Sequence, residues 1–178
     1  KNIVRQNFIA PDIGHFKSDV LANRYTKAFG SNLTSLTKYL AVKLDLEQFV
    51  SDNTIIISCV DNNKTRKLIS DCFDYLRPMH NSIIWIDSGN ERIGGQIFIQ
   101  GKSNEGFVTN ILDSYPEISP AQDKLPTELS CAEHAAEDTQ TLAVNSTAAN
   151  VIYNVATALL LKQRVYYYRV DFTVQKVC

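Results

Sequence analysis

A continuous run of β-branched residues constrains the fold of this chain more than any other feature. Residues 54–60 read Thr-Ile-Ile-Ile-Ser-Cys-Val, which suits a parallel strand buried on both faces better than an edge strand. Residues 64–76 then show a helical pattern that is closed by Pro78, and residues 82–87 form a second apolar strand. Strand, helix and strand in succession predict a parallel α/β sheet with a crossover helix.

Further helices and antiparallel strands are predicted around this unit. Residues 13–29 carry apolar side chains at helical spacing, with Gly30 as a stop. A polar strand is expected at 33–40 and a short helix at 44–50. After the strand at 82–87, a turn is expected at Gly89-Asn90, followed by the antiparallel partner of that strand at 93–100. The last expected elements are a helix at 138–162, whose end at 156–161 packs on the sheet, and a strand or hairpin arm at 164–175. Residues 101–137 lack periodicity and predict a long loop, which in a compact domain is usually functional or disordered.

Composition sets modest bounds on the class of protein. A chain of 178 residues with 44% hydrophobic residues predicts one globular domain with a sizeable core. The formal net charge of −1 gives no global bias toward nucleic acid or an anionic membrane, so neither is an expected partner. No apolar run approaches the roughly 20 residues of a membrane span.

The cysteines favour a reducing compartment and argue against a structural zinc site. The four are Cys59, Cys72, Cys131 and Cys178, and none forms a CxxC pair. Cys59 and Cys72 fall in a predicted strand and a predicted helix, where buried, inert thiols are expected. We therefore predict a cytoplasmic protein without structural zinc.

A set of polar residues with the chemistry of a triphosphate site runs along the chain. Its members are Asn2, Arg5, Gln6, Lys17, Asp61, Asn62 and Arg66. A carboxylate can hold magnesium, cations can take phosphate charge, and amides can fix orientation. Asp61 directly follows the strand at 54–60, and ligands of open parallel sheets bind outside the carboxyl ends of the strands. Asp61 could equally cap the helix that starts near Lys64, and the two roles are compatible.

The ordered motifs carry a family resemblance. Those of the first half are Asn2-Ile3-Val4-Arg5-Gln6, Asp12-Ile13-Gly14 with Lys17, and Cys59-Val60-Asp61-Asn62 with Thr65-Arg66. Together they resemble the ThiF/MoeB/HesA family of adenylating enzymes, which are related to ubiquitin-activating enzyme. The later motifs are Trp85-Ile86-Asp87-Ser88-Gly89-Asn90, Gly95-Gln96-Ile97 and Leu129-Ser130-Cys131-Ala132-Glu133. These look most like ThiF-family proteins of PRTRC-type plasmid systems.

The resemblance implies a Rossmann-like α/β sheet, parallel at first and antiparallel toward the C-terminal half, flanked by helices. It also implies a homodimeric, ATP-using adenylyltransferase that activates the C-terminal carboxylate of a small ubiquitin-like or sulfur-carrier protein. In that interpretation Arg5 and Lys17 clamp the phosphates, Asn2 and Gln6 orient the nucleotide with Asn62 beside them, and Asp61 holds Mg²⁺. Catalysis is then mainly positioning and charge stabilisation, with Arg5 and Asp61 as its residues.

Cys131 matches a recurring cysteine of the relatives, some of which form a thioester or persulfide there. The long loop before Cys131 could bring it toward an adenylate, and His134 could favour the thiolate. The alternative is that Ser130-Cys131-Ala132 simply begins a helix with small residues. The sequence is compatible with both interpretations.

The sequence also departs from the family pattern. The glycine-rich loop that cradles phosphates after the first strand is absent, so we expect residues 1–178 to be a single adenylation domain that lacks its N-terminal βαβ part and is inactive alone. The zinc-binding cysteine pairs of the sulfur-carrier activators are absent too. The alternative function is a non-catalytic member of the fold that binds partners in a plasmid-encoded system. A nucleotide-dependent oxidoreductase ranks last, because no acidic ribose-binding signature supports it.

Overall fold

A computed structural model of the chain describes residues 8–101, 110–119 and 141–174. It divides into two compact units, Lys1–Tyr39 and Leu40–Cys178. That the chain is a single adenylation domain stays a prediction. Within the described ranges, no helix is long and apolar enough to cross a membrane.

Among residues 8–39, the described part of the first unit, there is one substantial helix. The 3-10 helix η2 (Ala10–Asp12) precedes α1 (Lys17–Phe29), which confirms the predicted helix with a later start. Gly30 ends α1 in the left-handed conformation at φ 64°, as predicted. The predicted strand at 33–40 is wrong: these described residues are neither helix nor strand. A strand needs a neighbouring strand that accepts and donates its backbone hydrogen bonds, and no described strand pairs with this segment. The segment is instead tied to α1 by a side chain, because the Ser35 hydroxyl donates to Asp19 at 2.5 Å.

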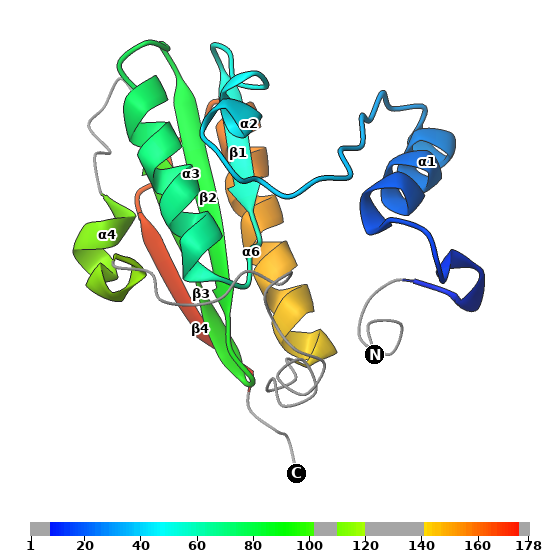
Figure 1. Cartoon of the computed structure of the whole chain (residues 1–178). Helices are drawn as coiled ribbons and strands as arrows, with labels where there is room; N and C mark the ends of the chain where they lie inside the picture. The colour runs from blue at the N-terminus through cyan, green and yellow to red at the C-terminus, as the bar shows by residue number, and fades with distance from the viewer. Residues whose placement is uncertain (1–7, 102–109, 120–140, 175–178) are drawn as a thin grey trace. The chain divides into compact units, whose positions relative to one another are not determined.

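The second unit is built on a four-stranded sheet in the order β1-β2-β3-β4 (Figure 1). Its strands are β1 (Thr54–Ser58), β2 (Ile83–Asn90), β3 (Gly94–Gly101) and β4 (Arg169–Thr173). β1 and β2 are parallel, with Ile56 opposite Trp85, and the other two pairings are antiparallel. The predicted α/β class, parallel first and antiparallel later, is therefore confirmed.

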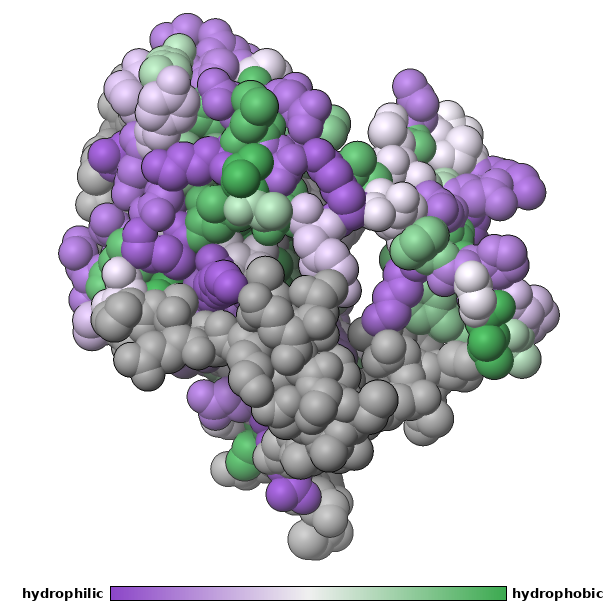
Figure 2. All heavy atoms as spheres, in the orientation of Figure 1, coloured by the Kyte–Doolittle hydropathy of each residue, from purple (hydrophilic) through white to green (hydrophobic). Residues whose placement is uncertain are grey.

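One face of the sheet is covered by the crossover helix α3 (Asn63–Leu76) and the short α2 (Leu44–Glu47). The predicted helix at 64–76 is thus confirmed. The core under α3 is mainly apolar. It contains Ile56, Ile69, Cys72, Phe73, Leu76, Ile83, Trp85, Phe98, Ile111 and Ile118. In Figure 2, hydrophilic residues are prominent over this side of the unit, interspersed with smaller apolar patches.

The long helix α6 (Leu142–Leu160) packs on the other face. Its N-terminus is capped by the hydroxyl of Thr141, which accepts the Val144 amide at 3.2 Å. Val155 is fully buried against the sheet, but Leu160 is 73% exposed. The prediction that the whole of 156–161 packs on the sheet is therefore wrong at its end: Leu159 still packs against the buried cluster, whereas Leu160 and Leu161 are exposed.

Two local predictions about the strands are also wrong. β1 is an edge strand of the described sheet rather than one buried on both faces, and Ile57 is 49% exposed because no described strand or helix covers it there. Gly89-Asn90 lies inside β2, and the turn comes later, where the Glu91 amide bonds the Gly94 carbonyl at 2.8 Å. The strands approach closely at this end, since a Cβ on Gly95 would lie 2.5 Å from the carbonyl oxygen of Gly89.

The predicted loop at 101–137 contains short helices where it is described. α4 (Ile111–Ser114) and the 3-10 helix η3 (Pro116–Ile118) cover part of the α3 face. The buried Gln100 anchors them, because its side-chain oxygen accepts the Ile111 amide at 3.1 Å. Side-chain anchoring of this kind leaves no periodic signal in the sequence. Residues 102–109 and 120–137 lie outside the described part of the chain.

Phe73 tests the core under α3. Its ring is fully buried and lies 6.1 Å from the Trp85 ring, between centroids. We expect Phe73→Ala to lower the free energy of unfolding by about 3–5 kcal/mol, through lost burial and a residual cavity. Urea unfolding followed by circular dichroism measures this. Tyr75→Ala, on the same helix but 47% exposed, is the control and should cost no more than about 0.5 kcal/mol. Equal losses in the two variants would contradict the assignment of this core.

Candidate functional site

The turn between β1 and α3 presents Asp61 to solvent. Asp61 follows β1 closely and is exposed. The N-cap of α3 is Asn62, whose side-chain oxygen accepts the Thr65 amide at 2.8 Å. The Asn62 side-chain nitrogen also donates to Asp61 Oδ1 at 3.3 Å. The alternative role of Asp61 as helix cap is therefore taken by its neighbour, and the Asp61 carboxylate lies at the helix N-terminus, where negative charge is favoured.

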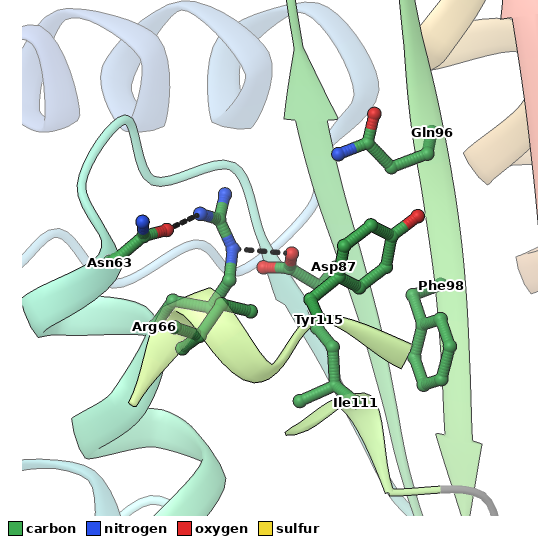
Figure 3. A pocket seen from close by; sticks show the side chains of 8 residues that line it. Asn63, Arg66, Asp87, Gln96, Phe98, Ile111 and Tyr115 are labelled. Atoms are coloured by element: carbon green, nitrogen blue, oxygen red, sulfur yellow. Dashed lines mark hydrogen bonds and ion pairs between the residues drawn. The ribbon is translucent and has the colours of Figure 1, made fainter. Parts of the chain in front are cut away.

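Arg66, one turn into α3, ties this loop to the sheet. Its Nε donates to Asp87 Oδ2 at 2.6 Å and its Nη1 to Asn63 Oδ1 at 2.9 Å. Its Nη2 reaches the carbonyl of Val60 at 2.9 Å and, more weakly, that of Ser88 at 3.4 Å. Figure 3 shows the guanidinium between Asn63 and Asp87. Because the ion pair is desolvated, with the side chains 11% and 5% exposed, its geometry is tightly specified.

Asp87 accepts the last bond of a chain of hydrogen bonds that begins in the core at Trp85. The Trp85 indole N–H donates to Ser58 Oγ at 2.7 Å, and the Ser58 hydroxyl donates to Asp87 Oδ1. Burial raises the pKa of Asp87 above its ordinary value, although the Arg66 charge and the Ser58 hydrogen bond oppose the rise. The raised pKa shows that desolvation outweighs the attraction of the partner cation at this carboxylate.

A small pocket lies beside this ion pair (Figure 3). Its polar lining comes from Asn63, Arg66, Asp87 and Gln96, and its apolar lining from Phe98, Ile111, Tyr115 and Ile118. Its volume is about 70 Å³, whereas pockets for drug-sized ligands span about 300–1,000 Å³. The pocket within the described residues therefore admits a few water molecules or a small group, and not a whole nucleotide.

Segment 110–119 forms the outer wall of the pocket. The Gln100 side chain connects this wall to α3. Its amide nitrogen donates to Asp74 at 3.3 Å, and its oxygen accepts the Ile111 amide. The Phe98 and Tyr115 rings meet edge to face, 6.2 Å apart between centroids. The Arg169 guanidinium lies 5.2 Å from the Tyr115 ring centroid, a cation–π contact. The wall is thus held by both polar and aromatic contacts.

The predicted site residues divide between described and undescribed parts of the chain. Lys17 is the first residue of α1, in the first unit, with its Nζ 5.7 Å from the Phe8 ring centroid. Asp61 and Asn62 are adjacent in the second unit. Asn2, Arg5, Gln6 and Cys131 lie outside the described residues. That Lys17 and Asp61 serve one site stays a prediction.

Asp87 is a member of this site that was not predicted from the sequence. One signal was available: Asp87 is the one ionisable residue in the apolar stretch that forms β2, where an acid needs a partner. The prediction for Cys59 is also wrong, because Cys59 is exposed just beyond β1, whereas Cys72 is buried as predicted. Partial burial of the sulfur, with the nearby Asp87 charge, still raises the pKa of the Cys59 thiol.

Comparison with protein families identifies the chain. The sequence model of the ThiF family matches residues 1–175. The chain belongs to the ThiF family. A comparison with curated proteins gives no significant match. The four-stranded sheet with its β1-α3-β2 crossover is consistent with the Rossmann-like fold of the ThiF family.

The ThiF family generally uses ATP and Mg²⁺, and the described residues can be tested for that fit. No group of three or more His, Cys, Asp or Glu side chains that could hold a metal occurs among them. Mg²⁺ is commonly bound by one or two carboxylates together with phosphate oxygens and water. A single exposed carboxylate, Asp61, at the carboxyl end of a parallel strand fits that kind of site. It does not fit a metal held by protein ligands alone.

Arg66→Gln tests the buried ion pair. At neutral pH we expect a loss of about 3–5 kcal/mol in the free energy of unfolding, because the Asp87 charge is left buried without its cation. Removing Arg66 raises the pKa of Asp87 further, so the folded state binds a proton at higher pH than the unfolded state, whose carboxylate titrates near about 4. The loss should therefore shrink as the pH falls toward 4. Urea unfolding at several pH values measures it, and a pH-independent loss would contradict this origin.

Proposed function

We propose that this protein is an ATP-dependent adenylyltransferase that activates the C-terminal carboxylate of a small ubiquitin-like or sulfur-carrier protein. The ThiF family typically acts with such carriers. The observation that carries the proposal is the β1–α3 turn, where Asn62 caps the helix and leaves the Asp61 carboxylate exposed. A carboxylate at this edge of a Rossmann-like sheet is well placed for a magnesium-bound triphosphate.

Each site residue has a proposed role in that reaction. Asp61 holds Mg²⁺ and Asn62 supports the nucleotide beside it. Arg5 and Lys17 take phosphate charge, while Asn2 and Gln6 orient the nucleotide. Mg²⁺ supplies charge neutralisation between the phosphates when bound. These side chains offer no general base, which is consistent with a carboxylate substrate that is already ionised at neutral pH.

The proposed chemistry is nucleotidyl transfer. A carboxylate oxygen of the carrier forms a bond to the α-phosphorus of ATP, and the bond from that phosphorus to the bridging oxygen of the β-phosphate breaks. Pyrophosphate leaves with the electron pair, and the acyl-adenylate of the carrier remains. Catalysis is mainly positioning and charge stabilisation.

We also propose a homodimeric, cytoplasmic protein of the PRTRC type.

Pyrophosphate exchange with the full-length protein tests the function. With candidate carriers present, we expect ATP–pyrophosphate exchange that falls at least about 100-fold in Asp61→Ala, since the metal loses its protein ligand. Asp71→Ala is the matched control: Asp71 lies on α3 and pairs with Lys67 on the preceding turn. Its removal should leave exchange within about twofold. Absence of exchange with every carrier would favour the alternative, a non-catalytic partner-binding component.

Cys131 provides a separate test, of the chemical step after adenylation. We expect the Cys131 thiolate to attack the acyl carbon of the adenylate and displace AMP, giving a thioester with the carrier that forms only with ATP and is broken by added thiol. Denaturing electrophoresis with and without reductant detects it. Cys59→Ala, which removes the exposed thiol beside β1, is the control and should keep the adduct. If Cys131→Ala forms the adduct as well as the wild type, Cys131 has no covalent role.

A further inference from the structure

Every nitrogen of the Arg66 guanidinium bonds a group of the protein itself. All of its nitrogens donate: Nε to Asp87, Nη1 to Asn63, and Nη2 to the carbonyls of Val60 and Ser88. A phosphate could displace these acceptors only by leaving the buried Asp87 charge uncompensated, which is costly. Although Arg66 is a cation in the same loop region as Asp61, its geometry is that of a holding residue and not of a phosphate ligand.

The groups that Arg66 holds surround Asp61 in the chain and in the sheet. Val60 immediately precedes Asp61, Asn63 is the first residue of α3, and Ser88 lies in β2. One side chain therefore bonds the backbone carbonyl just before Asp61 and the Asn63 side chain just after it, and connects this turn to the neighbouring strand. Because Asp61 itself is exposed, these contacts set the direction from which its carboxylate is presented.

The orientation of Arg66 depends in turn on Asp87. Asp87 is 4% exposed, and its two oxygens are used separately, one by Ser58 and the other by Arg66. Ser58 is itself fixed by the Trp85 indole N–H. Every link is buried or nearly so, which limits the rotamers available to Asp87 and, through it, to the guanidinium.

We propose that Asp87 is a positioning residue for the Asp61 site, acting through Arg66. The inference rests on the proposed function in so far as Asp61 binds Mg²⁺. Asp87 does not touch the nucleotide or the metal; it keeps the turn 60–63 in the one arrangement that presents Asp61 for coordination. Residues that orient a metal ligand from behind in this way typically change metal affinity about 10- to 100-fold when they are substituted.

The variant that tests this is Asp87→Asn, which keeps the shape of the side chain and removes its charge. An Asn carbonyl oxygen can accept from Ser58 or from Arg66, but its second position is a donor. Asp74→Asn is the matched control. Asp74 is likewise a carboxylate whose pKa is raised by burial, but it lies near the other end of α3 and accepts a hydrogen bond from Gln100 instead of Arg66. Both variants are made in the full-length protein.

Two measurements are needed. Hydrogen exchange of the backbone amides in peptides covering residues 59–66 measures how well the turn is held, and it needs no ligand. In Asp87→Asn we expect them to exchange at least about tenfold faster than in the wild type, from the loss of a charge-assisted hydrogen bond. The Mg²⁺ concentration giving half-maximal pyrophosphate exchange should rise about 10- to 100-fold. Asp74→Asn should move neither quantity more than about twofold. Trp85, the one tryptophan of the chain, should also change its emission in Asp87→Asn.

The outcomes separate the inference from the proposed function. Faster exchange at 59–66 together with a raised Mg²⁺ midpoint supports the inference. Unchanged exchange at 59–66 in Asp87→Asn overturns it, whatever the activity. Faster exchange with an unchanged Mg²⁺ midpoint in an active enzyme also overturns it, because the turn would then not govern the metal. A wild type that is inactive with every carrier counts against the proposed function alone, and the ligand-free exchange then decides whether Asp87 holds the turn.

Discussion

The parallel pairing of β1 with β2 is the constraint on which the rest of the second unit depends. Parallel strands cannot be joined by a tight turn, so the chain must cross over, and α3 makes that crossing. The carboxyl ends of both strands then lie at the same edge of the sheet. Asp61 and Asp87, which are well separated in the sequence, are placed in one region for this reason, one just beyond β1 and the other near the end of β2.

The two carboxylates lie in opposite environments, and the surrounding groups differ accordingly. Asp61 is exposed and keeps its hydration, so it needs no cation from the protein. Asp87 has lost its water, and its raised pKa shows that the cost is not fully offset by Arg66 and Ser58. A buried ion pair of this kind adds little net stability compared with apolar residues of the same size. Its contribution is specificity of geometry beside the turn that carries Asp61.

Much of this architecture could be predicted from local patterns. The β-branched run, the helix closed by Pro78 and the Gly30 stop each follow from backbone preferences of the residues themselves. The failures share a different cause. Residues 33–40 have strand-like spacing but gain no neighbour, Ile57 lies at an edge that composition does not reveal, and Gly89-Asn90 continues β2 because β3 pairs with it. Each depends on what lies beside the segment in space, which a single sequence does not state.

The candidate site shows the same division between local and tertiary information. Asp61 could be found from its place after a strand, but whether it served as a cap or as a ligand could not, because Asn62 next to it has equal capping ability. The structure assigns only the cap: the Asn62 amide side chain takes the helix N-terminus, and Arg66 takes the preceding carbonyl. The contacts that hold the turn therefore come from Asn62, Arg66 and Asp87. The Asp61 carboxylate accepts one long hydrogen bond from Asn62, at 3.3 Å, and is exposed, which is compatible with the proposed ligand role. Under the proposed function, the turn is held mainly by contacts that do not use the Asp61 carboxylate, which therefore stays exposed to solvent.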